Sequence, residues 1–154
     1  MMRLTFLMGV VAFSSPRAAR AGFAMDDSSI RTAVAAWLSN PTAAEATYGH
    51  ISTWETGGVT DMSQLFQGAS SFNEDIGAWD TSGVTEMYAM FWGASSFDRD
   101  IGGWAVHSVT SMDSMFESAK SFNQDIGDWA VDSVMKMKDM FRSTDAFNQD
   151  ISGW

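Results

Sequence analysis

The sequence contains no cysteine, and this absence excludes several kinds of chemistry at once. A chain without thiols forms no disulfide, has no thiolate nucleophile and offers no cysteine ligand to a metal. It also has no residue for a cysteine-linked lipid anchor. The cellular compartment stays open, because a chain with enough apolar core needs no disulfides. The apolar content of 45% is typical of a packed globular protein.

Basic residues are also scarce, since the formal net charge is −10. Residues 51–154 hold five Lys or Arg against sixteen Asp or Glu, so the excess of acid lies in this part of the chain. An acidic surface repels phosphate backbones, and we therefore expect no nucleic-acid binding. No run of about 18 apolar residues occurs after the N-terminal segment, and we expect no transmembrane helix there.

Residues 1–21 have the pattern of a targeting segment. Arg3 precedes an apolar stretch over residues 4–13, and Ala19-Arg20-Ala21 fits an A-x-A cleavage site. This pattern predicts a secretory signal peptide and a secreted or cell-surface protein that begins at Gly22. The stretch also contains Arg and Ser but no acid, so an organellar transit peptide is the second interpretation.

Residues 22–50 are predicted to form a helical cap. Apolar residues share one helix face at Ile30, Val34, Trp37 and Leu38. We expect Asp27 or Ser28 to cap this helix and Asn40-Pro41 to end it, because the residue before proline avoids the α region. Residues 42–45 resemble a capping box for a second short helix that Gly49 would close.

Residues 51–154 are a tandem repeat with a constant period and no insertion. The four full units are 51–75, 76–100, 101–125 and 126–150, and residues 151–154 start a fifth. Apolar residues recur in phase, as the stacked units of a repeat protein require for a continuous core. The predicted core columns include Ile76, Ile101 and Ile126; Trp79, Trp104 and Trp129; Val84 and Val109; Met87 and Met112; Phe91, Phe116 and Phe141; and Phe97, Phe122 and Phe147.

Within one unit the spacing predicts a helix and a short strand. Val84, Met87, Met90, Phe91 and Ala94 match one face of about three helical turns. Residues 97–104 have an extended apolar–polar pattern that is broken by glycine, which indicates a turn and a short strand. We therefore predict an α/β repeat solenoid that is similar to leucine-rich repeats, with parallel strands on one face and helices on the other.

The repeat closely resembles the BspA-like leucine-rich-repeat surface proteins. The resemblance rests on F-N-x-D-I-x-x-W at residues 122–129 and V-T-x-M-x-x-M-F at residues 109–116, and it covers about two thirds of the chain. It implies a secreted or surface interaction protein with a role such as adhesion, and no catalytic residues. The chain departs from the family where Gly77, Gly102 and Gly127 follow the isoleucine, a position at which the family often has serine.

The most regular polar feature is a column of aspartates. These are Asp75, Asp100, Asp125 and Asp150, with Asn or Asp two residues earlier in each unit. Stacked carboxylates would repel one another unless something compensates their charge, and calcium is one candidate. The alternative, which we favour, is that each side chain accepts backbone N–H groups in its own turn.

No catalytic constellation is present in the sequence. His50 and His107 occupy different repeat positions and have no neighbouring pattern of a triad or zinc site. The tryptophan column could stack on sugars, but its fixed spacing from isoleucine favours packing in the core. We predict no enzyme activity, no cofactor and no resident metal.

These observations predict a scaffold that binds a protein or a glycan at the cell surface. A calcium-dependent structural module and an intracellular interaction scaffold are the alternatives, and the ligand is not identified by the sequence. Because residues 151–154 supply no further coil, we expect the last full unit to expose Met137, Met140 and Phe141. Such an end predicts a longer natural protein, a truncated chain, or self-association through that end.

Overall fold

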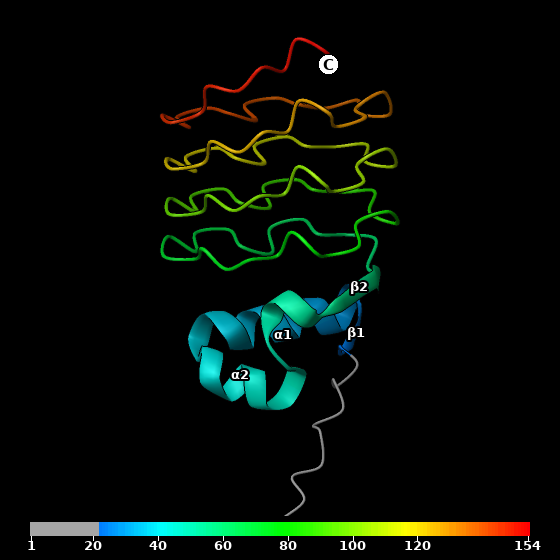
Figure 1. Ribbon diagram of the computed structural model, residues 1–154, viewed down its shortest axis with the longest axis vertical. Coiled ribbons are helices and arrows are strands. Elements are labelled where there is room, and N and C mark those ends of the chain that lie inside the picture. The colour runs from blue at the N-terminus through cyan, green and yellow to red at the C-terminus, as the bar shows by residue number, and fades with distance from the viewer. Residues whose placement is uncertain (1–21) are drawn as a thin grey trace, which may run out of the picture.

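The computed structural model describes residues 22–154, in which two helices lie against one end of a stack of coils (Figure 1). The predicted targeting segment, residues 1–21, lies outside the described residues. The elements are β1 (Ala24–Asp26), α1 (Asp27–Ser39), α2 (Pro41–Tyr48), a 3-10 helix (Ile51–Thr53) and β2 (Glu55–Gly58). Within residues 22–154 no helix has both the length and the apolar character needed to cross a bilayer.

Both helices expected before the repeats are present, but their N-caps differ from the expected ones. The Asp26 side chain, rather than Asp27 or Ser28, accepts the N–H groups of Ser28 and Ser29 and caps α1. Asn40 caps α2 by accepting the N–H of Ala43, and Pro41 occupies the first helical position, so residues 42–45 form no capping box. Gly49 closes α2 with a φ of 78°, a conformation that glycine adopts without strain.

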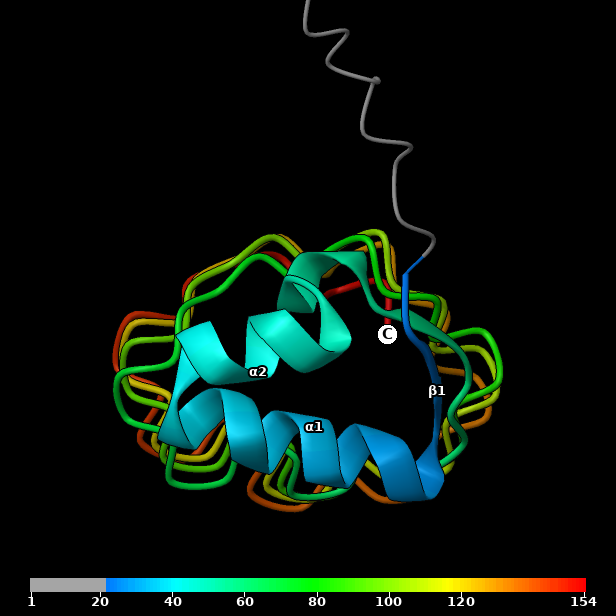
Figure 2. The ribbon, with the colours of Figure 1, turned by 90° about the horizontal axis from the view of Figure 1, so that it is seen from below.

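Helix α1 covers the end of the first coil and is fixed to it by two side chains (Figure 2). The Asp27 carboxylate accepts the Thr60 N–H at 2.7 Å, the Asp61 N–H at 3.0 Å and the Thr60 hydroxyl at 2.8 Å. Arg31 donates to the carbonyl oxygens of Ser63 and Asp61. Parallel pairing of β1 with β2 adds a third connection. The cap therefore supplies hydrogen-bond partners that a preceding coil would otherwise provide.

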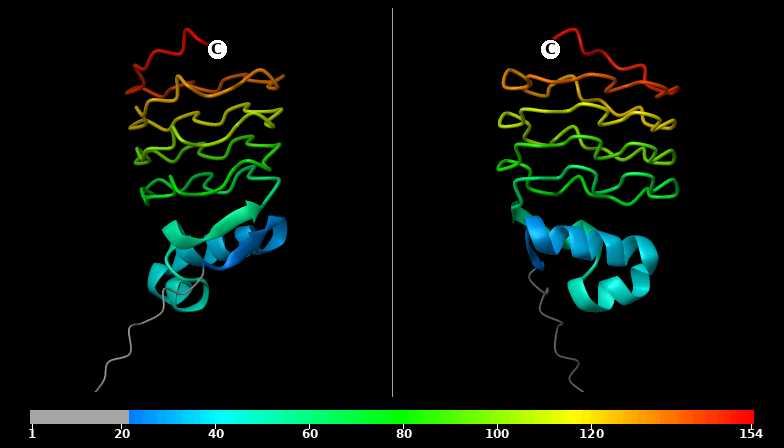
Figure 3. Two further views of the ribbon diagram at one scale, coloured as in Figure 1. Left: turned by 45° about the vertical axis from the view of Figure 1, so that its right-hand side comes forward. Right: turned by 180° about the vertical axis from the view of Figure 1, so that it is seen from behind.

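Successive repeats follow nearly the same path and stack one above another (Figure 3). We name them coil 1 (51–75), coil 2 (76–100), coil 3 (101–125) and coil 4 (126–150). Parallel bridges connect Asp61, Glu86, Ser111 and Lys136, which occupy the same position in successive coils. The Thr85 N–H donates to the Thr60 carbonyl and the Thr110 N–H to the Thr85 carbonyl. The sequence period is therefore also the hydrogen-bonding period.

The predicted helix over residues 84–94 is wrong, because this segment is a series of turns. Bonds from Met90 N–H to Met87 O and from Trp92 N–H to Ala89 O close successive turns. Ala89 and Gly93 have positive φ values of 51° and 73°, which interrupt a right-handed helix. Other N–H groups in the segment bond to the next coil instead. A chain of turns brings every third or fourth side chain inward, and this produces the helix-like spacing.

We call this segment the turn ladder: residues 61–68, 86–93, 111–118 and 136–143 of coils 1 to 4. All its backbone–backbone bonds between coils have the same direction, because N–H groups of one coil donate to carbonyls of the next. In coil 2 the donors Met87, Ala89, Phe91 and Gly93 reach the carbonyls of Ser111, Asp113, Met115 and Glu117. The ladder therefore has a direction, with its N–H groups toward the next coil and its carbonyl groups toward the previous one.

The short strand predicted within residues 97–104 is also absent. Residues 97–100 form no strand pairing, and the Trp104 N–H to Ile101 carbonyl bond at 3.1 Å closes a turn. An Asx column connects this part of successive coils instead, since the side chains of Asn73, Asp98 and Asn123 accept an N–H of the next coil. Side-chain oxygens thus replace backbone carbonyls as acceptors here.

The interior of the coils is filled by the repeated apolar columns. In coils 2 and 3 the Ile, Trp, Val, Met and Phe members are at most 4% exposed. Phe66, Phe91, Phe116 and Phe141 stack with ring centroids 5.5 to 5.8 Å apart. Each column tryptophan from Trp79 to Trp129 also donates its indole N–H to an isoleucine carbonyl of the previous coil. This bond ties each of these tryptophans to the backbone of the previous coil.

Coil 4 is less buried than the coils beneath it. Met137, Phe141 and Phe147 are half-buried, whereas Met140 is 3% exposed, so the expected exposure of Met140 is wrong. Among the described residues, the N–H groups of Met137, Asp139, Phe141 and Ser143 have no hydrogen-bond acceptor. The upper face of this coil therefore presents four backbone donors beside a partly exposed apolar interior.

Candidate functional site

Each member of the aspartate column bonds within its own turn. The carboxylates of Asp75, Asp100 and Asp125 accept the N–H of the glycine two residues later at 2.9 to 3.1 Å. Asp150 accepts the N–H of Ser152, and this bond, together with the Ser152 hydroxyl, lowers the Asp150 pKa. The geometry is that of an Asx turn, the alternative favoured from the sequence.

Residues 22–154 contain no group of three or more His, Asp or Glu side chains close enough to hold a metal ion. A shallow groove of about 400 Å³ beside the column is lined by Asp75, Gly77, Ala78, Asp100 and Gly103. It brings together two carboxylates, and each already accepts a backbone N–H. Calcium takes six to eight oxygen ligands, so this groove is a poor candidate for it.

The two histidines lie in different parts of the molecule and have different surroundings. The His50 ring lies edge-on to Trp37 at 5.1 Å, and its Nδ1 is 2.8 Å from the Ser52 hydroxyl at the start of the 3-10 helix. His107 is exposed on coil 3. No hydrogen bond links either ring to a carboxylate within the described residues. Among the described residues, neither histidine therefore has a carboxylate partner that would orient its ring.

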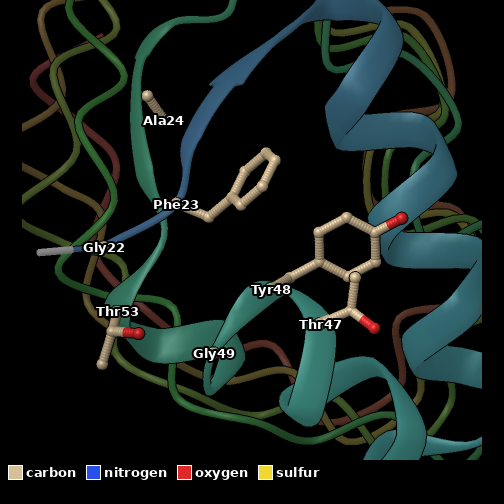
Figure 4. A pocket seen from close by; sticks show the side chains of 7 residues that line it. All are labelled: Gly22, Phe23, Ala24, Thr47, Tyr48, Gly49 and Thr53. Atoms are coloured by element: carbon tan, nitrogen blue, oxygen red, sulfur yellow. The ribbon is translucent and has the colours of Figure 1, made fainter. Parts of the chain in front are cut away.

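A cavity of about 330 Å³ lies between β1 and the C-terminal end of α2 (Figure 4). Phe23 and Tyr48 form one wall, with their ring centroids 5.2 Å apart and their planes nearly perpendicular. Thr47 and Thr53 also line it, but each hydroxyl donates to a backbone carbonyl of its own segment. The lining residues include no acid or base other than the tyrosine hydroxyl. The cavity has few polar groups free to orient a ligand.

The solvent side of the turn ladder, which we call the ladder face, differs from the interior because its columns vary. One column reads Ser63, Tyr88, Asp113 and Lys138, and the other reads Gln67, Trp92, Glu117 and Arg142. Tyr88 and Trp92 are 42% and 39% exposed, although Met87, Met90 and Phe91 between and beside them are fully buried. Coil 2 therefore places two aromatic rings in otherwise polar columns.

Polar and charged groups surround the two rings. Asp113 accepts the Lys138 N–H at 2.6 Å, Glu86 accepts the Thr110 hydroxyl at 2.9 Å, and Glu117 lies 3.6 Å from Arg142. Each carboxylate has lone pairs left after these contacts. Asp113 and Glu117 of coil 3 thus supply hydrogen-bond acceptors in the columns of the aromatic pair, and Glu86 supplies one from coil 2.

Tyr88 and Trp92 were missed from the sequence, because the repeat columns single out the residues that recur and not those that differ. The structure places the recurring tryptophans inside, where Trp79, Trp104 and Trp129 are 3 to 4% exposed. It places the non-recurring Trp92 outside. An aromatic residue that interrupts a polar column was the available signal, since burial does not require it there.

Comparison with known proteins identifies a family without a stated activity. No curated protein and no solved structure matches the chain. Residues 36–154, which include the end of α1, α2 and all four coils, match the family described as "Mycoplasma protein of unknown function, DUF285". The match covers more than half of the chain and the whole repeat, and the chain therefore belongs to this family.

Proposed function

We propose that this protein is a non-catalytic scaffold of the BspA-like, leucine-rich-repeat-like solenoid class, and that its ladder face binds a protein or a glycan. The proposal includes a secreted or cell-surface location, which rests on the pattern of residues 1–21. In this view the interior columns hold the coils together and the variable ladder face carries the recognition.

The exposed pair Tyr88 and Trp92 is the observation that carries this proposal. Large aromatic rings present apolar surface to water when they are exposed, so a scaffold has no energetic reason to place two of them outside. The same positions in coil 1 hold Ser63 and Gln67, which shows that the coil accepts polar residues there. Aromatic side chains are enriched at binding interfaces for the same physical reason.

The absence of a catalytic role is supported by the environments of the polar side chains. Catalysis needs neighbouring groups held in different environments, so that one can act as an acid and the other as a base. The aspartates of the repeat column instead share one environment, because each makes the same bond in its own turn. The ladder face has acceptors and rings but no histidine.

The direct experiment measures binding of the fluorescently labelled full chain to intact cells of the source organism. The variant Tyr88→Ser/Trp92→Gln installs the residues of coil 1 at the same columns, so we expect the coils to fold normally. Saturable binding by the wild type and its loss in the variant is the expected result. Leu38→Ala removes a comparably exposed residue from α1 and is the matched control. Equal binding by all three proteins would contradict the proposal.

The alternatives predict other outcomes. An intracellular scaffold would keep residues 1–21, so mass spectrometry of the native N-terminus separates it from an exported protein that begins at Gly22. A calcium-dependent module would lose stability with chelator. Self-association through coil 4 would bury the half-exposed Phe141 and Phe147. Two copies of that end would, however, bring N–H donors against N–H donors, so a symmetric dimer would leave the ladder donors unpaired.

A further inference from the structure

We infer that Tyr88 and Trp92 form a stacking platform for an uncharged glycan, with the polar side chains of coils 1 and 3 as its hydrogen-bonding borders. This inference rests on the proposed function and narrows it, since it selects one of the two ligand classes. Either a free polysaccharide or the glycan of a glycoprotein could supply the same chemistry.

The backbone positions of the two exposed residues are close enough for one ligand to contact both rings. Both belong to coil 2, and the bond from the Trp92 N–H to the Ala89 carbonyl closes a turn between them. A turn holds its first and fourth Cα atoms within 7 Å and one more residue adds at most 3.8 Å, so the Cα atoms of Tyr88 and Trp92 lie within about 11 Å. Two adjacent sugar rings of an extended oligosaccharide can cover this distance.

The side chains beside the rings suit hydroxyl groups. Because each column has one member in every coil, Gln67 and Glu117 lie in the coils directly before and after Trp92. Asp113 has the same relation to Tyr88. Amides and carboxylates accept hydrogen bonds from sugar hydroxyls, and the apolar C–H face of a sugar ring packs on the negative face of an aromatic ring. The ladder face offers both kinds of contact side by side.

The surroundings of the rings favour a glycan over a folded protein partner. The core of a stable protein interface is apolar and depleted of charge, and each partner buries about 800 Å². Here the other ladder-face positions of coils 1 to 3 are polar or charged, including Asp61, Glu86 and Asp113. Two rings bordered by carboxylates give little continuous apolar area, but they suffice for stacking on sugar rings.

The carboxylates beside the platform disfavour acidic glycans, and the basic ladder-face residues Lys138 and Arg142 lie on coil 4, one coil farther from the rings. Glu86, Asp113 and Glu117 all lie on the ladder face of coils 2 and 3, and the repeats as a whole are strongly acidic. Arg142 is engaged with Glu117 at 3.6 Å, so it neutralises a carboxylate of the border. Sulfate or uronic acid groups placed over the rings would meet like charge. The preferred ligand is therefore neutral.

The test is affinity electrophoresis of the full chain in native gels that contain one probe each. The neutral probes are a mannan, a β-glucan, a xylan and a glycoprotein with neutral N-glycans, and dextran sulfate is the acidic probe. We expect retardation by at least one neutral probe and none by dextran sulfate. Tyr88→Ser/Trp92→Gln should weaken that retardation about tenfold or more, because two stacking contacts are lost. Leu38→Ala should behave as the wild type.

Retardation by dextran sulfate alone, by no probe, or equally in wild type and double variant would overturn the inference. Periodate oxidation of cell-surface sugars separates this failure from that of the proposed function. If the wild type still binds periodate-treated cells and the double variant does not, the ladder face binds a partner that is not a glycan. If the double variant binds untreated cells normally, both proposals fail.

Discussion

Within the turn ladder, the interior Met and Phe columns and the ladder face share one segment of each coil but follow opposite rules. In coils 1 to 3 these two columns hold the same residues at nearly the same burial, as at Phe66, Phe91 and Phe116, each fully buried. The ladder face changes from coil to coil and carries Gln67, Trp92 and Glu117 in one column. Packing between coils therefore constrains the interior residues, whereas the ladder-face residues are free to vary and to serve recognition.

The neighbours Phe91 and Trp92 give the sharpest test of this contrast. Phe91→Ala should lower the free energy of unfolding by about 3–5 kcal/mol, because it leaves a cavity among stacked rings. Trp92→Gln should lower it by no more than about 1 kcal/mol, because its ring is already partly in water. Urea denaturation of both variants measures the two values.

The same comparison of an interior and an exterior substitution can be made at the equivalent positions of coil 3. Phe116→Ala should again cost about 3–5 kcal/mol, and Glu117→Ala less than about 0.5 kcal/mol, since its ion pair with Arg142 is long and largely exposed on the arginine side. Equal costs at the interior and exterior positions in either coil would remove the distinction between the two faces.

Adjacent glycines in coil 3 test how closely the coils approach each other. A Cβ atom on Gly102 would lie 2.6 Å from the Asp125 carbonyl oxygen at the end of the same coil, where the chain passes back over its start, whereas a Cβ on Gly103 would meet nothing within 4 Å. Gly102→Ala should therefore cost about 1–3 kcal/mol. Gly103→Ala should be neutral or stabilising by up to about 1 kcal/mol. Similar melting temperatures for the two variants would show that the coils can separate freely.

The contact between the cap and coil 1 should depend on pH. Hydrogen bonds from the Thr60 and Asp61 N–H groups and the Thr60 hydroxyl lower the Asp27 pKa in the folded protein. Asp27 thus stabilises the fold above its unfolded pKa of roughly 3.9, and this contribution is lost as the pH falls through the lower folded value. Asp27→Asn should reduce the melting temperature most above about pH 5, and the difference from wild type should shrink toward pH 3.

The control for this measurement is Asp128→Asn on the exposed side of coil 4, where the carboxylate accepts no recorded hydrogen bond from the described residues. Its melting curve should follow the wild type at every pH. A constant difference between Asp27→Asn and wild type across the pH range would show that the carboxylate does not hold the cap.

Calcium should have the smallest effect. Since each column aspartate already accepts an N–H in its turn, we expect a chelator to leave the melting temperature unchanged. A ligand that binds only the folded state raises stability with its concentration. A clear fall in melting temperature on adding chelator would therefore revive the calcium-dependent alternative.

The sequence was sufficient to find the period, the interior columns and the two cap helices, because all three depend on which residues are apolar and how they are spaced. Spacing could not separate a helix from a series of turns. Both bring residues such as Val84, Met87 and Phe91 to one side. The feature that excludes a helix is the positive φ at Ala89 and Ser114. Alanine and serine seldom adopt a positive φ, so the residue types at these positions did not predict the turns.

The contacts between coils also could not be predicted from the spacing of residues in the sequence. Glycine at residues 77, 102 and 127 looked like a departure from the resembled family, but it permits the close approach of the aspartate carbonyl at the end of the same coil. The cap contacts of Asp27 and Arg31 likewise join residues that are distant in the sequence. Such pairs depend on how the coils stack, which a single sequence does not state.

Hydroxyl-radical footprinting of the full chain tests the central claim most directly, because it reports how strongly each aromatic side chain contacts solvent. The account predicts fast labelling of Trp92 and Tyr88 and slow labelling of Trp79, Trp104 and Trp129. Addition of a glycan that binds the chain should protect Trp92 and leave the highly exposed Met135, outside the platform, unchanged. Labelling of Trp104 as fast as Trp92 would contradict the division between interior columns and ladder face.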